Sequence, residues 1–351
     1  MKTIIQKITF DKENNRAIIT DAAQIIRTGG LVAFPTETVY GLGGDAFDEK
    51  AAAHIYEAKG RPSDNPLIVH ISKVEDLSKV CDLVPDKAYI LAEKFWPGPL
   101  TLIVRKNDRI PMSVTGGLNT VAVRLPSHEV ARSLIEESGT FVAAPSANLS
   151  GRPSPTTGAH VIEDLDGRVD MIIDAGPIDI GLESTIVDLS EEIPVILRPG
   201  FVTKEMLEDA IGEVRLDPAL MSGVKDNVAP KAPGMKYRHY APKAELTVVK
   251  GNNDKVIAAM REMLHRDIQK GLKVGIMISL DNKEYFEEGE VICLGNSIDG
   301  EEIAKHLFAA LREFDARNVD VIYSEAFSEE GIGQAIMNRL QKAAGHKTIN
   351  V

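Results

Sequence analysis

The sequence predicts an α/β protein with two domains and a linker between them. Over roughly the first two hundred residues, short apolar runs alternate with helical patterns. A stretch rich in Pro and Gly follows, and a second alternation of strands and helices begins at Glu245. At 351 residues the chain also exceeds the usual size of a single domain. We therefore expect a first domain at 1–216, a linker at 217–244 and a second domain at 245–351.

The strands expected in the first domain are rich in Val, Ile and Ala and alternate little, so both of their faces should be covered. Some connections are too short for a helix crossover, which predicts a twisted mixed sheet with flanking helices. The expected strands are Leu31–Phe34, Leu67–Ile71, Leu100–Val104, Val121–Arg124, Phe141–Ala144, Met171–Asp174, Ser184–Leu189 and Val195–Leu197. The expected helices are Asp21–Arg27, Asp48–Lys59, Pro85–Phe95 and Glu129–Glu137.

The linker shows no hydrophobic period and is punctuated by Pro and Gly, although it is rich in Tyr, Arg and His. The regular alternation after it predicts a small doubly wound, Rossmann-like parallel sheet. The expected elements are strand Leu246–Val249, helix Asp254–Gln269, strands Lys273–Ile278 and Val291–Leu294, helix Glu301–Ala316, strand Val319–Tyr323 and helix Ile332–Ala344. No catalytic constellation stands out there. Gly331–Gly333 could bind a phosphate before the last helix, but the sequence favours a tight turn.

Composition limits the function classes. The net charge of −12 argues against tight binding to bulk nucleic acid. A local basic pocket remains possible, because salt screens charges beyond ~8 Å. The first ten residues alternate apolar and polar side chains, so we expect neither a signal peptide nor a membrane anchor there. Cys81 and Cys293 have no pairing or metal-ligand spacing. We expect a cytoplasmic protein that does not bind membranes.

Two distant stretches carry the clearest chemical signal. Lys59 and Arg61 flank a glycine at the end of an expected helix, and Ser146 and Asn148 follow an apolar strand. Together they would supply fixed positive charge and neutral donors, which suit a polyphosphate. The alternative for the basic pair is a solvated helix C-terminus. The stiff polar loop that follows favours function, and an extended segment would place both cations on one side.

Further polar residues lie at strand ends. His70, Arg124 and Arg198 end apolar strands, and Ser184 opens one, which predicts a site at one edge of the sheet. A lone His such as His70 is more often a core residue.

The segment 35–44 follows a buried strand and is rich in hydroxyl groups and glycine. Its hydroxyl groups and three glycines would leave backbone groups open to a ligand, with an ordinary turn as an equal alternative. The residues concerned are Thr36, Thr38, Tyr40, Gly41, Gly43 and Gly44. Glu37 could be an acid, a base or an indirect magnesium ligand.

Several familiar site types are missing from the sequence. It has no Gly-x-x-x-x-Gly-Lys-Ser/Thr loop, no nucleophile elbow around Ser146 and no His/Cys metal cluster. If the polyphosphate belongs to a nucleotide, dispersed side chains on a concave sheet would have to hold it.

The motifs together resemble the YrdC-type threonylcarbamoyl-AMP synthases. The resemblance runs in order over roughly residues 10 to 205, and it is carried by Pro35–Leu42, Lys59–Pro62, Asn65–His70, Trp96–Thr101, Ala144–Asn148 and Glu183–Ile186. The stretch Ala232–Pro242 and the second α/β domain resemble the two-domain long form of that family.

This resemblance implies that L-threonine, bicarbonate and ATP give threonylcarbamoyl-AMP and pyrophosphate. A tRNA threonylcarbamoyl transferase would then receive the intermediate. Mg²⁺ would accompany ATP, and no residue would bind a metal directly. Lys59 and Arg61 would be catalytic. The family's ATP contacts map onto Lys59, Arg61, Asn65, Thr120, Ser146, Asn148, Ser154, Arg198 and Tyr237. Its threonine contacts map onto Thr38, His70, Arg124, Ala144 and Ser184.

Tyr237, Arg238, His239 and Tyr240 are expected to close over the nucleotide as a lid that shields a labile anhydride from water.

Two alternatives are left open by the residues. A concave basic sheet could form an RNA-binding module, although the acidic net charge counts against it. A carbamoyl transferase that forms carbamoyl-adenylate from carbamoyl phosphate could use the same fold. Bicarbonate dependence separates the two enzymatic readings.

Overall fold

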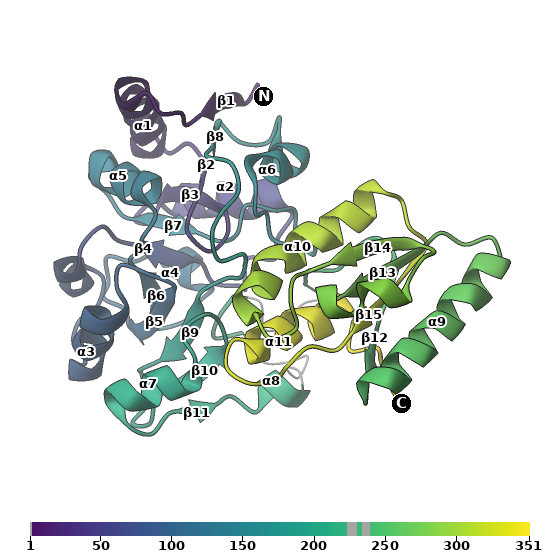
Figure 1. Ribbon diagram of the computed structural model, residues 1–351. Coiled ribbons are helices and arrows are strands. Elements are labelled where there is room, and N and C mark those ends of the chain that lie inside the picture. Colours follow the sequence, from purple (N-terminus) through teal and green to yellow (C-terminus); the bar gives the residue numbers. More distant parts are fainter. Residues whose placement is uncertain (1, 223–229, 234–238) are drawn as a thin grey trace. The chain divides into compact units, whose positions relative to one another are not determined.

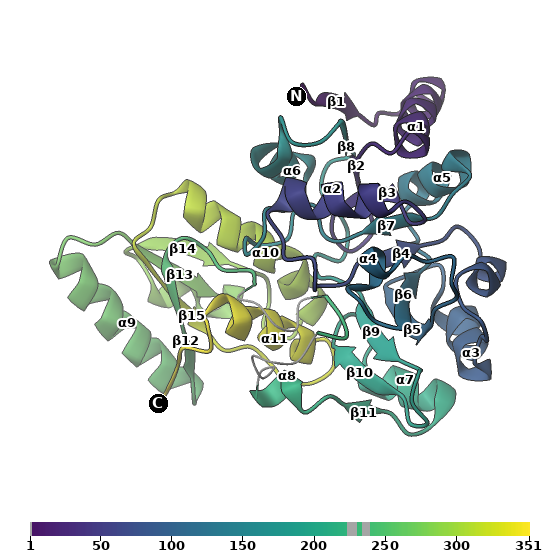
Figure 2. The ribbon, with the colours of Figure 1, turned by 180° about the vertical axis from the view of Figure 1, so that it is seen from behind.

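The computed structural model describes residues 2–222, 230–233 and 239–351 of the chain (Figures 1 and 2). It divides into two compact units. The first comprises Met1–Ser150, Ser154–Asp179 and Glu183–Tyr237, and the second comprises Gly151–Pro153, Ile180–Leu182 and Arg238–Val351. The expected linker, 217–244, contributes residues to both units.

An eleven-stranded mixed sheet runs through the described part of the first unit. Its order is β1-β8-β2-β3-β7-β4-β6-β5-β9-β10-β11, and parallel and antiparallel pairs occur along it, as the short connections predicted. The strands are β1 (Ile4–Lys7), β2 (Val32–Phe34), β3 (Gly41–Asp45), β4 (Ile68–His70), β5 (Leu100–Arg105), β6 (Thr120–Arg124), β7 (Val142–Ala144), β8 (Met171–Asp174), β9 (Thr185–Asp188), β10 (Val195–Arg198) and β11 (Arg215–Leu216).

The helices of the first unit are α1 (Lys12–Arg27), α2 (Glu49–Lys59), the 3₁₀ helix η1 (Val74–Lys79), α3 (Asp86–Phe95), α4 (Met112–Thr115), α5 (Glu129–Ser138), α6 (Gly158–Leu165), α7 (Lys204–Ile211) and α8 (Ala219–Ser222). The predicted start of α1 at Asp21 is wrong. The Asp11 side chain caps the helix by accepting hydrogen bonds from the backbone of Glu13 and Asn14. None of the helices in the described ranges is long and apolar enough to span a bilayer.

Side chains that alternate along the strands build separate cores on the sheet of the first unit. Val32 and Phe34 pack with residues of α1 and α5, whereas Leu31 and Ala33 belong to the larger core that includes α2. A third, smaller cluster lies on β4, β6, β5 and β9 and includes Ala232 of the expected linker. This part of the sheet carries the predicted site residues.

The second unit is a parallel sheet with helices on both faces, as predicted. Its described strands follow the order β14-β13-β15-β12-β16. They are β12 (Glu245–Lys250), β13 (Val274–Ile278), β14 (Glu290–Cys293), β15 (Val321–Glu325) and β16 (Thr348–Asn350). The helices are α9 (Asn253–Gln269), the 3₁₀ helix η2 (Leu280–Tyr285), α10 (Gly300–Ala316) and α11 (Gly333–Ala343).

The two faces of this second sheet are covered by different helices. Ile276 packs with α9, and the neighbouring Gly275 lies against Phe314 of α10, which matches the alternation of a strand that is buried on both faces.

Candidate active site

The strand register brings predicted site residues from distant parts of the chain into one row. His70 on β4 lies beside Arg124 on β6, and Arg124 lies beside Thr101 on β5. Paired residues on neighbouring strands project to the same face, so the three side chains line a common surface. Strand pairing therefore assembles this site.

Arg124 is the centre of a buried polar network. Its guanidinium donates to Glu37 Oε1 at 2.6 Å, to Thr38 Oγ1 at 2.9 Å and to the Gly98 carbonyl at 3.3 Å. Burial disfavours ionisation of Glu37, but the charge and hydrogen bond of Arg124 outweigh it, and the pKa of Glu37 falls below its usual value. Glu37 is therefore an ionised partner that orients Arg124.

His70 is neutral in this environment. Burial, reinforced by the nearby charge of Arg124, lowers the pKa of His70 to about 3. Its Nδ1 lies 3.0 Å from the carbonyl of Ile68. A carbonyl only accepts, so Nδ1 carries the proton and Nε2 is left as an acceptor. A neutral imidazole with so low a pKa is a weak base. It is therefore better suited to accept a hydrogen bond from a substrate group than to take a proton from it.

Ser184 joins the predicted threonine residues to the predicted ATP residues. Its hydroxyl lies 2.7 Å from Thr101 Oγ1 and accepts from Arg198 Nη2 at 3.0 Å. The preceding residue, Glu183, accepts a hydrogen bond of 2.5 Å from Ser154 Oγ. The structure thus brings Ser184, Arg198 and Ser154 into one connected group.

Lys59 meets the Ser146–Asn148 stretch, as the sequence predicted. Its ammonium group donates to the backbone carbonyls of Ser146 and Asn148. The Ser146 hydroxyl donates to Asn148 Oδ1 at 2.6 Å. Only 2% of Lys59 is exposed, so the alternative of a solvated helix end is wrong.

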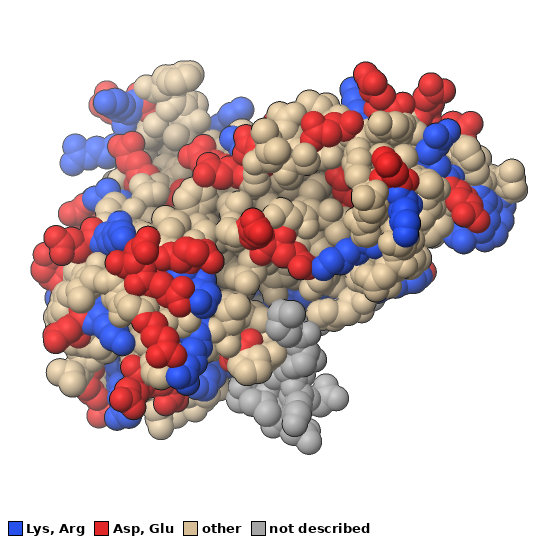
Figure 3. Space-filling view, turned by 60° about the horizontal axis from the view of Figure 1, so that its bottom comes forward, with Lys and Arg blue, Asp and Glu red and all other residues tan. Residues whose placement is uncertain are grey.

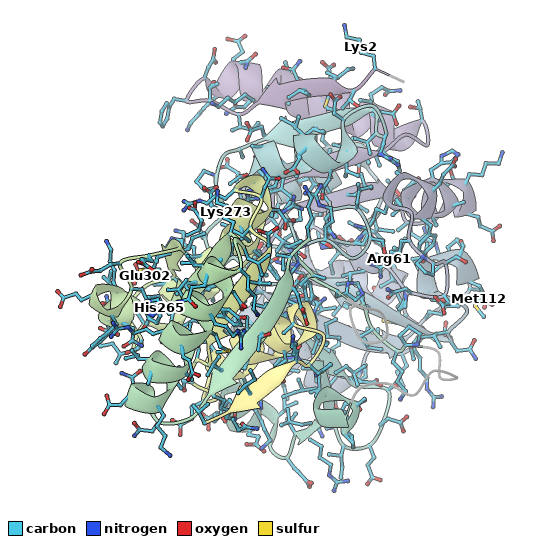
Figure 4. The ribbon with its side chains drawn as sticks, turned by 90° about the vertical axis from the view of Figure 1, so that its right-hand side faces the viewer. Lys2, Arg61, Met112, His265, Lys273 and Glu302 are labelled. Carbon is cyan, nitrogen blue, oxygen red and sulfur yellow. The ribbon has the colours of Figure 1, made fainter. Side chains whose placement is uncertain are left out.

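The backbone at the basic pair differs from the expected extended segment. Lys59 is the last residue of α2, and Gly60 ends the helix in the left-handed conformation with φ of 61°. Arg61 therefore turns back and donates to the carbonyls of Asn65 and Pro66 at 3.3 and 3.1 Å. In Figure 4 Arg61 lies within the first unit, whereas Met112 is at its surface.

Three further predicted residues are less closely tied to the network. Asn65 is 1% exposed, and its Oδ1 atom has no hydrogen-bond partner among the described residues. Ala144 on β7 pairs with Ile68 on β4, two residues before His70. Thr120 begins β6, four positions before Arg124 and on the same face.

The expected lid falls partly outside the described residues. Tyr237, a predicted ATP contact, and Arg238 both lie there. His239 and Tyr240 are buried in the second unit, where the Tyr240 ring lies 4.9 Å from that of Phe308.

The glycines after Tyr40 do not leave the backbone open, which corrects the expectation for segment 35–44. Gly41–Asp45 forms β3 and pairs with β2 and β7. A Cβ atom on Gly43 would lie 2.5 Å from Val142 Cγ1, so glycine permits close packing there. The Tyr40 hydroxyl donates to the Gly176 carbonyl at 2.7 Å and serves the fold.

The structure also adds residues that sequence reasoning did not assign. Thr101 on β5 is paired with Arg124, which in turn is paired with His70, and the Thr101 hydroxyl is hydrogen-bonded to that of Ser184. Glu183 orients Ser154. Both residues lie inside the motifs named above, but their partners are 83 and 29 positions away along the chain, so only the three-dimensional fold could reveal these contacts.

Comparisons with known proteins agree with the resemblance. A family model described as "Telomere recombination", named for Sua5, YciO and YrdC, matches residues 24–200. A second, described as "Threonylcarbamoyl-AMP synthase, C-terminal domain", matches residues 202–345.

Full-length relatives agree as well. The threonylcarbamoyl-AMP synthase of Pyrococcus abyssi is 52% identical over 94% of this chain and 95% of its own. That of Bacillus subtilis is 46% identical over 97% of both chains. The structure described as P. abyssi Sua5 complexed with L-threonine has a TM-score of 0.92 and 49% identity, and the match covers 100% of both chains.

Proposed function

This chain belongs to the two-domain threonylcarbamoyl-AMP synthases of the YrdC and Sua5 type, and from that premise we propose how its first unit uses L-threonine, bicarbonate and ATP. The observation that carries the proposal is a pair of hydrogen-bonded groups, Thr38–Arg124 and Thr101–Ser184–Arg198, which lie side by side because Arg124 and Thr101 are paired on neighbouring strands. It joins the residues assigned to threonine with one assigned to ATP, so both substrates would meet on one face of the sheet.

Threonine would bind along the row on β4 and β6. Arg124 is held by three acceptors, and its remaining N–H groups can pair with the substrate carboxylate. The hydroxyl groups of Thr38 and Ser184 provide partners for the substrate hydroxyl. Such partners would be left unpaired by an analogue without the hydroxyl, which is a strong basis for rejecting it.

ATP would bind where Lys59 meets Ser146 and Asn148. Lys59 and Arg61 supply positive charge for the phosphates, and Ser154, Arg198 and the unpaired Oδ1 of Asn65 supply further polar contacts. These groups are already held in place by the fold, so they can stabilise developing charge without reorganising. Catalysis would depend mainly on positioning and electrostatics.

Mg²⁺ belongs to this proposal as a companion of ATP. No cluster of three or more His, Cys, Asp or Glu residues suited to a metal occurs in the described ranges. In this proposal the ion takes its ligands from the phosphate groups of ATP and from water. When bound it would neutralise phosphate charge near Lys59 and Arg61.

The reaction would proceed in three steps on this surface. Bicarbonate first takes up a proton and loses water to give carbon dioxide. The neutral threonine amine attacks the carbon dioxide, forms the C–N bond of a carbamate and releases a proton, which balances the proton taken up by bicarbonate. A carbamate oxygen then attacks the α-phosphorus of ATP, and pyrophosphate leaves. Since His70 has a pKa of about 3, it would accept a hydrogen bond from the substrate rather than take the proton. A tRNA threonylcarbamoyl transferase would consume the product.

Pyrophosphate release from ATP tests the proposal, with L-threonine and bicarbonate added singly and together. Release should require both, and it should fall at least about 100-fold in Lys59→Met, which removes a buried charge from the phosphate site. Lys50→Met, at an exposed position of the same helix, is the control. Turnover without threonine, or with carbamoyl phosphate in place of bicarbonate, would overturn the proposal.

A further inference from the structure

The second unit contains two tripeptides that adjoin the proposed site in sequence. Gly151–Pro153 lies between Asn148 and Ser154, and Ile180–Leu182 directly precedes Glu183. Within the second unit, helix α10 contacts both tripeptides. This arrangement gives that unit a direct covalent connection to proposed ATP contacts.

Arg312 of α10 holds the first tripeptide. Its Nε and Nη2 atoms both donate to the Pro153 carbonyl, at 3.1 and 2.6 Å. The Ala241 backbone adds a hydrogen bond of 2.9 Å to the Gly151 carbonyl. Only 4% of Arg312 is exposed. Burying a guanidinium costs free energy, and an apolar side chain would fill this position of the helix at lower cost. The two hydrogen bonds from Arg312 to one carbonyl therefore indicate that Arg312 serves to hold Pro153.

The second tripeptide lies against the same helix. Gly181 has φ of +84°, and a Cβ atom there would lie 2.4 Å from the Cα atom of Lys305 on α10. The next residues along the chain are Glu183, which accepts the Ser154 hydroxyl, and Ser184. Helix α10 thus contacts the chain one residue before Ser154, at Pro153, and two residues before Glu183, at Gly181.

We propose that Arg312 is a positioning residue of the synthase: by holding the Pro153 carbonyl, it sets the place of the Ser154 hydroxyl at the ATP site. This inference rests on the proposed assignment of Ser154 to ATP. Arg124 and His70, which are assigned to the binding of L-threonine, lie on strands β6 and β4 and not in this loop. Loss of the Arg312 contact should therefore weaken ATP use and spare threonine binding.

The test uses the full chain with Arg312→Met, Arg312→Lys and Ser154→Ala, and Arg317→Met as the control. Arg317 directly follows the same helix, and its side chain pairs with Glu313 and Glu290, neither of which belongs to a tripeptide. Steady-state pyrophosphate release gives KM for ATP and kcat, calorimetry gives Kd for L-threonine, and thermal melting reports folding.

Arg312→Met should raise KM for ATP about tenfold or more, since a hydrogen bond from a charged group is lost. Arg312→Lys, which keeps one donor, should recover part of this loss. The Kd for threonine should stay within about twofold of wild type, and Arg317→Met should match wild type in both. If Arg312→Met does not fold, Arg312→Gln carries the same comparison.

Combining substitutions separates the possible failures. If Arg312 acts through Ser154, Arg312→Met should add little to the effect of Ser154→Ala. An unchanged KM for ATP in folded Arg312→Met, equal losses for ATP and threonine, or full additivity with Ser154→Ala would each overturn the inference. A wild-type enzyme that releases no pyrophosphate would instead overturn the proposed function.

Discussion

At the scale of single residues, the site depends on buried charges whose partners come from other segments. Glu37 and Arg124 form a salt bridge of 2.6 Å with side chains only 7% and 4% exposed. The sequence identified both residues, but it left the role of Glu37 open among acid, base and magnesium ligand. The contact was not predictable, because the fold brings Glu37, in the loop after β2, together with a strand residue 87 positions away in the chain.

Removing one partner of this pair should be costly. Arg124→Met would leave the Glu37 carboxylate buried without its cation, and we expect a loss of about 3–5 kcal/mol in the free energy of unfolding. The double variant Glu37→Gln/Arg124→Met should recover at least about 1 kcal/mol, because the stranded charge is gone. Urea denaturation measures both. Arg105→Met, at an exposed position of β5, is the control, and a double variant no more stable than the single one would refute this account.

His70 should make stability depend on pH. Its pKa is about 3 in the folded protein and 6.5 by default, so below pH 6.5 the unfolded chain binds a proton that the folded chain does not. Stability is therefore fully present above pH 6.5 and is lost as the pH falls toward 3.

Replacement of His70 isolates this effect. Between pH 6 and 4.5, His70→Gln should remove a slope of up to about 1.4 kcal/mol per pH unit from the unfolding free energy. The pKa of His128 is also lowered, but that residue is present in both proteins and cancels in the difference. His54→Gln, at an exposed position, should leave the slope unchanged. Parallel curves for wild type and His70→Gln would refute the assignment.

At the scale of elements, helices and strands with a clear apolar pattern were predictable from the sequence. Elements that depend on contacts with distant residues were not. The helix ending at Lys59 and the strands around His70 and Arg124 follow from apolar runs with clear boundaries. The polar first half of α1 has no apolar period, and its Asp11 cap was missed. The glycine-rich β3 contradicts strand propensity, and its glycines fit because Phe34 and Val142 pack closely against Gly43 and leave no room there for a side chain.

This reading of β3 can be tested by adding a methyl group. Gly43→Ala would place a Cβ atom 2.5 Å from Val142 Cγ1 and 2.7 Å from Phe34 Cε1, and should cost about 1–3 kcal/mol. Val142→Ala creates space at the first contact. The double variant should therefore lose less stability than the sum of the two single losses, as measured by urea denaturation. Simple additivity would show that Gly43 is not limited by this contact.

At the scale of the whole molecule, charge constrains the role of RNA. The chain carries a net charge of −12, and acidic and basic side chains are interspersed over the face shown in Figure 3. The doubly wound second sheet was predictable from the alternation of strands and helices, and the mixed first sheet from connections too short for a helix crossover. The tripeptides that belong to the second unit were not, because no local pattern marks them.

Direct binding of tRNA should accordingly be weak. At about 150 mM salt we expect no saturable retention of tRNA at micromolar protein in a filter-binding assay, since too few phosphates would be neutralised. A positively charged, well-characterised RNA-binding protein serves as the positive control. Tight binding that falls steeply with salt would restore the RNA-binding alternative.

The division of the chain has a consequence for exchanging parts between enzymes. From Ser150 to Arg238 the polypeptide leaves the first unit at Gly151, returns at Ser154, leaves again at Ile180 and returns at Glu183. The second unit is therefore not a cassette that begins at one junction. A chimera that takes its C-terminal half from another synthase would inherit α10 without the matching tripeptides. Both would have to be transplanted together for the hybrid to keep its native contacts.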